Sequence, residues 1–391
     1  MIGVIADDLT GAAELGAVGW RRGLRAHVVC GGVIDGQADL VCMDTDSRSC
    51  ASDEAAQRAA SAAGLFAEKG ARWIYKKVDS VLRGNVIAEV EAILKQLHLR
   101  LALLAPANPS LGRAVRNGMY LIHGRPLHET EFARDPEHPR HSSEVLALLG
   151  SGRDFSVRWG RPTDALPAAG IVVGDAGTAE DLQQWAGRLN AGMLPAGGVE
   201  FFGALLTARG CSPAGPRLEH PRGSTSLPGL LICGSTSETA REFVRAASER
   251  GTPVFPLPEN LASGAEFTPA ALEEMVQPVV AALRLHRHVI LNIGWPSLRQ
   301  PSRARLPAML LVQAAEAVLR QAGVGDIYVE GGATAAELVR RLGWRRLEVL
   351  GELALGVTTM ATKEVPALRL TIKPGSYSWP DEVRRIFLGL R

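Results

Sequence analysis

Several residue types and patterns are scarce in this chain of 391 residues. Its five cysteines are odd in number and include no Cys-x-x-Cys pair, which argues against a disulfide framework and a zinc knuckle. No apolar run approaches the roughly 18 residues that a membrane span needs. Asp7 and Asp8 stand where a signal peptide would have its apolar core. We therefore expect a cytoplasmic protein that does not bind a membrane.

An excess of charge of one sign is also missing. The chain has 43 Lys+Arg and 41 Asp+Glu, a net charge of +2, so it lacks the strong field that favours nucleic acid or an anionic membrane as a partner. This balance favours a small polar ligand. Lysine itself is rare, and three of the six lysines lie in the segments "YKKVDS" and "IKPGS". A compact, rotatable cation suits a phosphate or carboxylate oxygen.

Short β-branched runs alternate with Ala- and Leu-rich stretches of helical period along the whole chain, a pattern typical of α/β folds with mostly parallel strands. The length favours two domains. Residues 210–229 are rich in Gly, Pro and Ser and show neither period, so we interpret them as a linker. We expect domains at 1–215 and 229–391, each a mostly parallel sheet layered with helices, with the active-site cleft between them.

The first domain is predicted to contain strands at 2–6, 27–31, 40–44, 72–78, 101–107 and 171–176, helices at 10–22, 52–69 and 85–97, and a hairpin at 118–127. A further helix follows the last of these strands, with Thr178 and Asp181 at capping-box spacing. The second domain is predicted to contain strands at 230–234, 253–257, 288–294 and 326–332, and helices at 237–251, 268–284, 305–322 and 334–343.

Three strand ends of the first domain carry unusual polarity: "ADDLTG", "DTDSRS" and "KKVDSVLRGN". Because parallel strands end at one edge of a sheet, these segments are expected to share a ligand-binding rim. Other interpretations are a helix cap for the Asp pair, a solvated cation for Arg48 and a surface ion pair in the third segment. A cap needs only one Asp, however, so the second Asp favours a functional role.

In the second domain, the turns "CGSTSETA" and "EGGATAAEL" place small residues at helix starts, where free N–H groups attract anions. Plain capping is the alternative, since Ser235 to Glu238 and Thr334 to Glu337 both fit the S/T-x-x-E box. Both turns together, with "KPGSY" at a third strand end, favour a nucleotide-phosphate site. It is neither a Walker A loop nor a dinucleotide fingerprint.

Four histidines, His123, His128, His138 and His141, crowd one segment, but prolines interrupt it and the spacing fits no standard zinc ligand set. We expect no metal held by protein ligands there and interpret the segment as a loop that lines the cleft.

The motifs "IADDLTGAAELG", "DTDSRS", "YKKVDSVLRGNV", "APANPSLGRAVRNGMYLIHGRPLHETEFARDP", "GSTSETAR", "GGATA" and "KPGSYS", in this order, resemble the four-carbon acid sugar kinase family. The resemblance spans nearly the whole chain. It implies an N-terminal domain that holds the acid sugar, a C-terminal domain that holds ATP, and phosphorylation of the terminal hydroxyl. Mg²⁺ on the ATP phosphates is expected with it.

Carried over residue by residue, the resemblance implies these substrate contacts: Asp8, Arg48, Asp79, Ser80 and Arg83, with Lys77 close by. It implies these nucleotide contacts: Ser235, Gly331, Gly332, Ala333, Thr334 and Gly375. Ala333 stands where the family usually has an acidic residue, and Lys373 to Ser378 depart from the family's K-S-G-x-F-G-like stretch.

The chemistry of phosphoryl transfer assigns roles to the polar rim. Asp8, with Asp7 as the alternative, is expected to orient the sugar hydroxyls and accept the hydroxyl proton while its neighbour caps the helix. Lys77 would offset charge on the transferred group. Arg48 and Arg83 are expected to hold the substrate carboxylate.

Two other classes of function stay open, a non-catalytic two-lobed sensor of acid sugars and a kinase of an unrelated hydroxy acid. The missing dinucleotide fingerprint argues against a dehydrogenase. The stereochemistry of the substrate and the oligomeric state, a homodimer included, are also left open.

Overall fold

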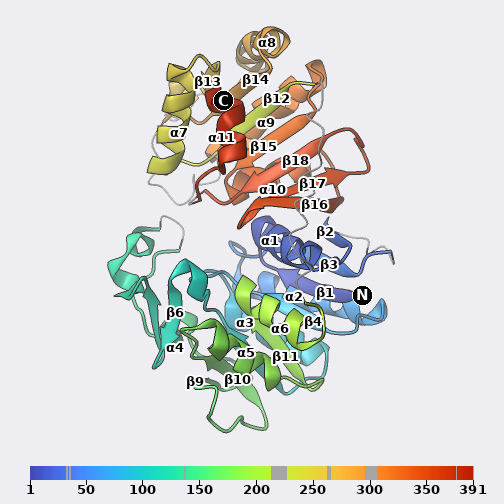
Figure 1. The fold of residues 1–391 in the computed structure, drawn as a ribbon, viewed down its shortest axis with the longest axis vertical. Helices are drawn as coiled ribbons and strands as arrows, with labels where there is room; N and C mark the ends of the chain where they lie inside the picture. The colour runs from blue at the N-terminus through green and yellow to red at the C-terminus, as the bar shows by residue number, and fades with distance from the viewer. Residues whose placement is uncertain are drawn as a thin grey trace. The chain divides into compact units, whose positions relative to one another are not determined.

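The computed structural model describes all residues except 32–33, 35–36, 136–137, 213–226, 262–265, 296–305, 376 and 391. The fold divides into two compact units, Met1–Arg217 and Leu218–Arg391, which we call the N-terminal and C-terminal units (Figure 1). Most of the predicted linker at 210–229, and the first residue of the helix predicted at 305–322, lie outside the described residues.

The N-terminal unit is built on a parallel sheet with the strand order β2-β3-β1-β4-β11-β5-β10-β9. The strands are β1 (Ile2–Ala6), β2 (Ala26–Cys30), β3 (Leu40–Asp44), β4 (Ile74–Lys77), β5 (Leu101–Ala105), β9 (Val157–Gly160), β10 (Gly170–Gly174) and β11 (Met193–Gly197). Most of these strands are nearly continuous apolar runs because helices cover both faces of the sheet.

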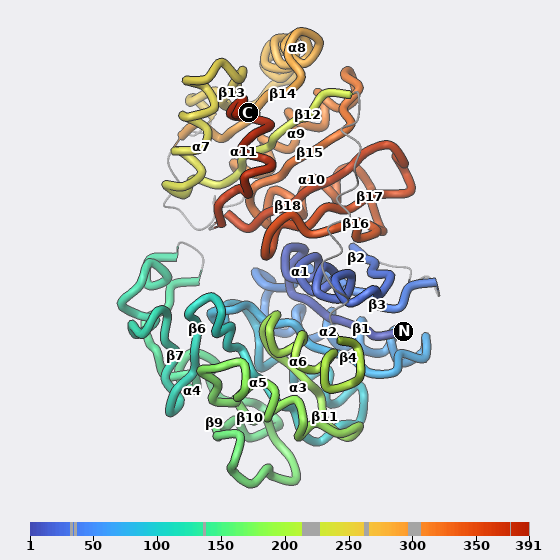
Figure 2. The backbone as a smooth tube through the Cα atoms, viewed as in Figure 1, coloured from blue at the N-terminus to red at the C-terminus, as the bar shows by residue number. Residues whose placement is uncertain are grey.

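The helices of this unit form two groups. On one side α1 (Leu9–Trp20) and α5 (Ala179–Gly187) pack against α6 (Val199–Ala208), and on the other α2 (Ser52–Glu68) packs against α3 (Val86–Gln96) (Figure 2). Glycine in β1 allows close packing, since a Cβ at Gly3 would lie 2.7 Å from the ring of Phe66 in α2. The predicted capping box of α5 is confirmed, because Thr178 and Asp181 each bond the other's backbone N–H.

A small antiparallel sheet confirms the predicted hairpin and contains β6 (Arg113–Arg116), β7 (Met119–Ile122) and β8 (Arg125–Pro126). Short 3-10 turns flank it at Pro109–Leu111, Leu127–Glu129 and Glu131–Arg134, and the short helix α4 (Val145–Leu149) follows. Gly112 must be glycine here. Its φ is +65°, and an added Cβ would lie 2.2 Å from Nδ1 of His123.

The strands of the C-terminal unit follow the order β13-β14-β12-β15-β18-β17-β16. Its strands are β12 (Gly229–Cys233), β13 (Val254–Pro256), β14 (His288–Asn292), β15 (Asp326–Glu330), β16 (Arg346–Ala354), β17 (Val357–Thr362) and β18 (Arg369–Lys373). The first five in this order are parallel, and β17 and β16 continue the sheet antiparallel. The sequence did not predict the β16–β17 hairpin.

Helices also form two groups in this unit. The first contains α7 (Glu238–Glu249) and α11 (Asp381–Leu388), and the second contains α8 (Pro269–Leu285), α9 (Leu306–Gln321) and α10 (Gly332–Arg341). A 3-10 turn lies at Glu259–Leu261. The observed layers confirm two α/β units with mostly parallel sheets.

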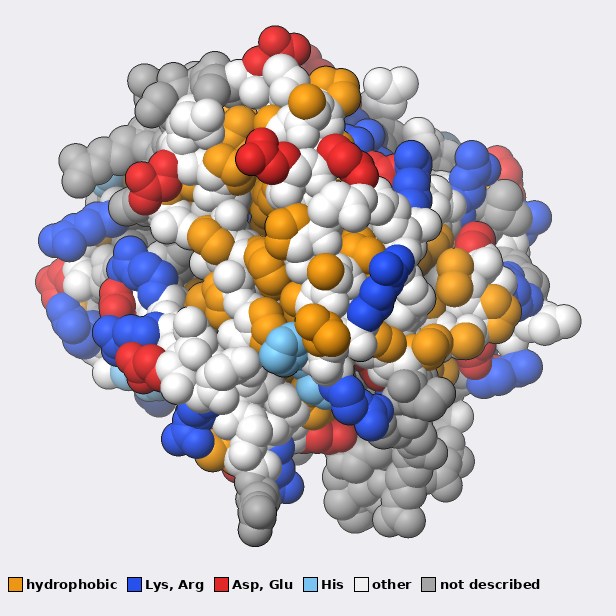
Figure 3. Space-filling model, turned by 90° about the horizontal axis from the view of Figure 1, so that it is seen from above, with side chains coloured by type: hydrophobic (Ala, Val, Ile, Leu, Met, Phe, Trp, Pro, Cys, Tyr) orange, Lys and Arg blue, Asp and Glu red, His pale blue; other side chains and the backbone are white. Residues whose placement is uncertain are grey.

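Apolar side chains are not confined to the interior. They gather toward the middle of the face that Figure 3 shows, with most of the charged side chains nearer its sides. Exposed apolar surface of this kind is common in folded proteins, and by itself it indicates no function. Within the described part of the chain, no helix combines the length and the apolar character needed to cross a membrane.

Candidate active site

Strand register brings three polar loops of the N-terminal unit to one edge of its sheet. Ala6, the last residue of β1, lies opposite Asp44 in β3 and Lys77 in β4. Because these strands are parallel, the loops that follow them leave at the same carboxyl edge. The structure therefore brings together the Asp7–Asp8 pair, the loop with Arg48 and the segment 79–83.

Arg48 is the centre of this cluster. Its Nε and Nη2 donate to the two carboxylate oxygens of Asp7 at 2.8 and 2.9 Å, and its Nη1 donates to Asp8 Oδ2 at 2.8 Å. The same Nη1 lies 3.6 Å from Asp79 Oδ1. One guanidinium thus offsets the repulsion between two adjacent carboxylates, and this arrangement explains how the chain tolerates the Asp pair.

Asp7 and Asp8 divide their roles differently from the sequence prediction. Asp8, not Asp7, caps α1, since Asp8 Oδ1 accepts from the N–H of Gly11 at 2.9 Å. The side chain of Asp8 is also 21% exposed, whereas that of Asp7 is only 3% exposed. Asp8 is therefore both the helix cap and the member of the pair that a ligand can reach.

The charge state of Asp8 follows from its neighbours. Burial alone would raise the pKa of this carboxyl, but Arg48 and Lys77, with hydrogen bonds from Thr10 and Gly11, lower the pKa below its usual value. Thr10 Oγ1 donates to Asp8 Oδ2 at 2.6 Å. Asp8 is thus a carboxylate at neutral pH and can accept hydrogen bonds from a hydroxyl group.

Asp79 and Arg83 form a second charged pair at this edge. Arg83 donates to the two oxygens of Asp79 at 2.9 and 2.8 Å, and its Nη1 donates to Asp135 at 2.8 Å. Burial would raise the pKa of Asp79, but Arg83 and Arg48 hold it well below its ordinary range. Both arginines that were expected to hold a substrate carboxylate therefore already bind carboxylates of the protein.

Lys77 lies beside the Asp8 end of α1. Its Nζ donates to the carbonyl of Val78 at 2.9 Å and lies 3.8 Å from Glu14 Oε2. A Cβ built on Gly11 would lie 2.6 Å from Asp8 Oδ1 and 3.4 Å from Lys77 Nζ, so the ammonium and the carboxylate flank the same glycine. The absence of a Cβ at Gly11 thus leaves room for both groups.

Sequence reasoning missed two residues of this cluster, Glu14 and Arg113. Glu14 lies one helical turn after Gly11, and burial raises the pKa of its carboxyl against the opposing charge of Lys77. Arg113 begins β6, and its Nη1 donates to the hydroxyl of Ser80. Both residues lie inside the quoted family motifs, but nothing in their spacing from the polar strand ends points to the site.

The C-terminal unit shows a comparable convergence of loops. Cys233 lies opposite both Asn292 and Glu330, and Glu330 lies opposite Lys373. The loops at 234–237, 331–334 and 374–377 therefore leave the sheet at one edge, although Ser376 lies outside the described residues.

The contacts among these loops are close. Ser237 Oγ donates to the carbonyl of Gly375 at 3.1 Å, and Ser235 Oγ donates to the same carbonyl at 3.4 Å. A Cβ on Gly331 would lie 3.7 Å from the backbone nitrogen of Ser235. The predicted nucleotide contacts Ser235, Gly331 and Gly375 are therefore neighbours.

The starts of α7 and α10 differ from the alternative interpretation of these turns, in which Ser235 and Thr334 would cap the two helices. Ser237, not Ser235, caps α7, because its Oγ accepts from the N–H of Ala240 at 3.2 Å. Thr334 lies buried inside α10, whose N-cap is Gly331 at φ +105°. That glycine offers no side chain to the first turn, so the N–H groups of residues 332–334 are available to an anion.

A buried ion pair supports the third loop. Lys373 Nζ lies 3.0 Å from Glu330 Oε1, and both side chains are 1% exposed. Lys373 also donates to the carbonyls of Pro374, at 3.0 Å, and Tyr377. Burial raises the pKa of Glu330 and lowers the pKa of Lys373, and their mutual attraction opposes both shifts. Lys373 therefore holds the loop around Gly375 in place.

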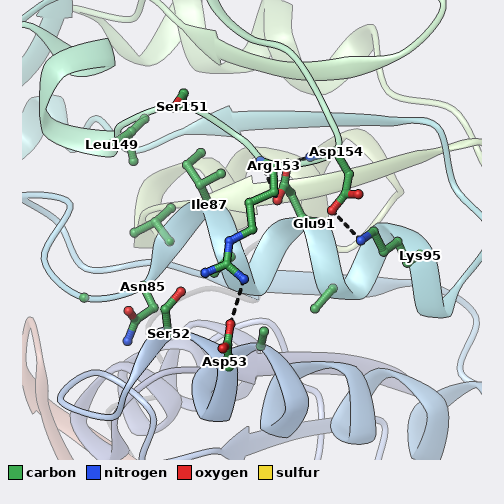
Figure 4. A pocket seen from close by; sticks show the side chains of 15 residues that line it. Ser52, Asp53, Asn85, Ile87, Glu91, Lys95, Leu149, Ser151, Arg153 and Asp154 are labelled. Carbon is green, nitrogen blue, oxygen red and sulfur yellow. Dashed lines mark hydrogen bonds and ion pairs between the residues drawn. The ribbon is translucent and has the colours of Figure 1, made fainter.

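Two cavities accompany these features. One, of about 370 Å³, has Ser235 in its wall together with Thr236, Arg241, Asn292 and Trp295. The other, of about 310 Å³, is lined by the start of α2, by α3 as far as Lys95 and by residues between Leu149 and Asp154 (Figure 4). In the second cavity Arg153 binds Asp53 at 2.7 Å, and Lys95 binds Asp154. These charges are paired, so we assign this cavity no ligand.

Comparison with known proteins now places the chain in a family. A sugar-binding N-terminal domain model matches residues 2–198, and a nucleotide-binding C-terminal domain model matches residues 230–377. A D-threonate kinase of Cupriavidus necator is 31% identical over 96% of this chain and 94% of its own. The chain belongs to the four-carbon acid sugar kinase family.

Other relatives of this family differ in the substrate that they are named for. A D-erythronate kinase of Heliobacterium modesticaldum is 33% identical over 62% of this chain and 59% of its own. A 3-oxo-tetronate kinase of Methylobacterium radiotolerans is 27% identical over 97% of each chain. The chain is thus a kinase of this family, a phosphotransferase with an alcohol group as acceptor.

Solved structures show the same fold. A Haemophilus influenzae protein matches with a TM-score of 0.70 at 22% identity over 99% of both chains. A protein of Salmonella typhimurium LT2 matches with a TM-score of 0.77 at 20% identity over 98% of both chains. Both matches support the two-unit α/β architecture.

Proposed function

We propose that this kinase transfers the γ-phosphoryl group of ATP to the terminal hydroxyl of a four-carbon acid sugar of the threonate, erythronate or oxo-tetronate class. The observation that carries the proposal is the placement of Asp8. It is a charged, partly exposed carboxylate beside Lys77, in the unit that matches a sugar-binding domain model.

Phosphoryl transfer to an alcohol depends mainly on alignment and on neutralisation of charge. In this proposal Asp8 accepts a hydrogen bond from the acceptor hydroxyl and takes its proton as transfer proceeds. Arg48 holds the carboxylate of Asp8 in one orientation through the 2.8 Å hydrogen bond. Lys77 offsets charge on the transferred group. Asp7 keeps Arg48 in place and does not react.

We propose that the second charged pair supplies the remaining contacts to the substrate. Asp79 and Arg83 shape the floor of the sugar site, and the hydroxyl of Ser80 lies on the same segment. Asp79, Ser80 and Arg83 lie close to Asp8 because the carboxylate of Asp79 also approaches Arg48, which binds Asp8. Their hydrogen bonds to one another make this part of the site rigid before a ligand binds.

The nucleotide is proposed to bind the C-terminal unit. The N–H groups of Gly332, Ala333 and Thr334 at the start of α10 suit phosphate oxygens, and the lack of a capping side chain at Gly331 leaves room for them. Ser235 and Gly375 complete the turn. Mg²⁺ supplies further charge neutralisation to the ATP phosphates when it is bound. We accordingly propose residues 1–215 as the acid-sugar-binding domain and 229–391 as the nucleotide-binding domain.

An ATP-dependent phosphorylation screen over four-carbon acid sugars tests the proposal. The full chain is incubated with ATP and Mg²⁺ and each acid, and the position of the new phosphate is read by NMR. We expect one of these acids to be phosphorylated on its terminal hydroxyl. Turnover only with another hydroxy acid would refute the substrate class. Acid-sugar binding with no ATP consumption would refute the kinase reaction itself and favour a two-lobed sensor.

A further inference from the structure

The structure leaves open which group recognises the carboxylate of the acid sugar. Arg48 and Arg83 are the obvious cations of the N-terminal site, but protein carboxylates occupy both. Arg48 binds Asp7 through two nitrogens and Asp8 through the third. Arg83 binds Asp79 through two nitrogens. A substrate carboxylate near either guanidinium would also meet the negative charge of these aspartates.

Arg113 differs from both of them. Its side chain is half-buried, and its Nη1 donates to the hydroxyl of Ser80, a neutral acceptor. Within the described part of the chain, no carboxylate lies at ion-pair distance from its guanidinium. A guanidinium has five N–H donors, so most of those of Arg113 remain available to a ligand.

Arg113 is also held in a defined position. Its backbone N–H donates to the carbonyl of Asn108 at 3.1 Å, and the N–H of Asn108 donates back to its carbonyl at 2.9 Å. Its guanidinium carbon lies 5.8 Å from the centre of the Phe132 ring. Together with the bond to Ser80, these contacts fix the side chain before a ligand arrives, which lowers the entropy lost on binding.

The neighbours of Arg113 are the groups proposed to act in catalysis. The charges of Lys77, Asp8 and Arg113 all act on the carboxyl of Glu14 in α1. Ser80, the partner of Arg113, directly follows Asp79. The guanidinium therefore lies within the same cluster as Asp8.

Arg140, an arginine of the same unit, also has no carboxylate partner at ion-pair distance among the described residues. Its Nε donates to the carbonyl of His138 at 3.1 Å, and its Nη1 donates to the carbonyl of Leu82 at 3.0 Å. These bonds tie two backbone segments together. Arg140 thus has a structural role that Arg113 lacks, and it provides a matched control.

We propose that Arg113 binds the carboxylate of the acid sugar and so gives the enzyme its preference for acids over neutral sugars. Arg113 approaches the carboxylate with two parallel N–H donors, the geometry in which arginine binds carboxylates most strongly. The identity of the substrate in this inference rests on the proposed function. The binding test that follows measures no phosphoryl transfer, so it can succeed or fail independently of that reaction.

A comparison of the affinity for an acid with the affinity for its primary amide separates recognition of the negative charge from every other contact. We would measure by calorimetry the binding of the best four-carbon acid and of the amide of that acid to the parent, Arg113→Met, Arg113→Lys and Arg140→Met. The parent is expected to prefer the acid. Arg113→Met should weaken acid binding by about a hundredfold, the scale of two charge-assisted hydrogen bonds, and leave amide binding within a few-fold. Arg113→Lys should lie between the parent and Arg113→Met.

Arg140→Met should keep the preference for the acid, and ATP binding should be unchanged in all variants. Loss of the preference in Arg140→Met but not in Arg113→Met would overturn the inference, as would equal losses for acid and amide. If Arg113→Met does not fold, the comparison of Arg113→Lys with the parent decides the question. A parent that binds acids selectively but transfers no phosphoryl group would refute the proposed function and leave the assignment of Arg113 standing.

Discussion

Arg48 and Asp7 form a bidentate ion pair, in which Arg48 Nε lies 2.8 Å from Asp7 Oδ2 and Arg48 Nη2 lies 2.9 Å from Asp7 Oδ1. This pair leaves Nη1 of Arg48 to hold Asp8. The two aspartates at the end of β1 thus have separate tasks. Asp7 fixes the arginine, and the arginine fixes the orientation of Asp8.

The first prediction compares these two aspartates. Asp8→Asn should lower kcat by at least about a hundredfold, the scale of losing a general base, with little loss of stability because asparagine also caps helices. Asp7→Asn should lower turnover less but reduce thermal stability more, since it removes one charge from a buried ion pair. Steady-state kinetics and thermal melts on both variants check this. Turnover within a few-fold of the parent in Asp8→Asn would leave Asp8 with the capping role alone.

Asp44, the last residue of β3, gives a prediction about pH. Burial raises the pKa of its carboxyl to about 8, and the nearby charges of Asp8 and Asp46 add to the effect, against a hydrogen bond from the N–H of Asp46. The folded state therefore keeps a proton that the unfolded chain releases near pH 4. Stability from this group is fully present below about pH 4 and falls as pH rises toward about 8.

Asp44→Asn tests this pKa shift, because asparagine is neutral and nearly isosteric with aspartate. The variant can still accept the 2.8 Å hydrogen bond from the N–H of Asp46. Its melting temperature should fall less steeply with pH than that of the parent between about pH 5 and about pH 8. Parallel profiles for the two proteins would show that Asp44 does not titrate with folding.

The start of α10 gives a prediction about nucleotide binding. Gly332→Val should abolish ATP binding because a branched side chain would occupy the approach of a phosphate to the first-turn N–H groups. Ala333 is exposed, so Ala333→Glu should be tolerated and should strengthen binding only when Mg²⁺ accompanies ATP. Calorimetry with and without Mg²⁺ measures both. Undiminished ATP binding in a folded Gly332→Val variant would move the phosphates away from this turn.

The buried pair of Lys373 and Glu330 gives a prediction about stability. Lys373→Met leaves the Glu330 carboxyl without its cation and should lower the free energy of unfolding of the C-terminal unit by about 3 kcal/mol. Adding Glu330→Gln should restore part of this loss, because the neutral amide can still accept from Trp379 Nε1, which donates to Glu330 Oε2 at 2.7 Å. Urea denaturation of the single and double variants measures the difference. A double variant no more stable than Lys373→Met would mean that the charge of Glu330 is not what destabilises the single variant.

Much of the fold could be predicted because a strand covered on both faces occurs in the sequence as a short apolar run between segments of helical periodicity. Several elements escaped prediction, and for two of them, β11 and β16, the physical reason is plain. β11 contains Pro195, which argues against a central strand, and it pairs with β4 only at Ala196 and Gly197, beyond the proline. β16 lies in an antiparallel hairpin with a partly exposed face, and its mixed pattern of Leu, Glu and Val does not resemble the buried parallel strands.

The sequence by itself determined where polar groups would gather, because each strand end is a fixed place in the chain and parallel strands end at a shared edge. Only the tertiary structure decided which of these groups neutralise one another. Arg48 reaches Asp7 and Asp8 across 41 and 40 positions of sequence, and Arg113 reaches Ser80 from a separate small sheet. Ion pairs form over a few ångströms of space and depend on strand register and side-chain reach, so spacing along the chain cannot tell a paired arginine from one that is free to bind a ligand.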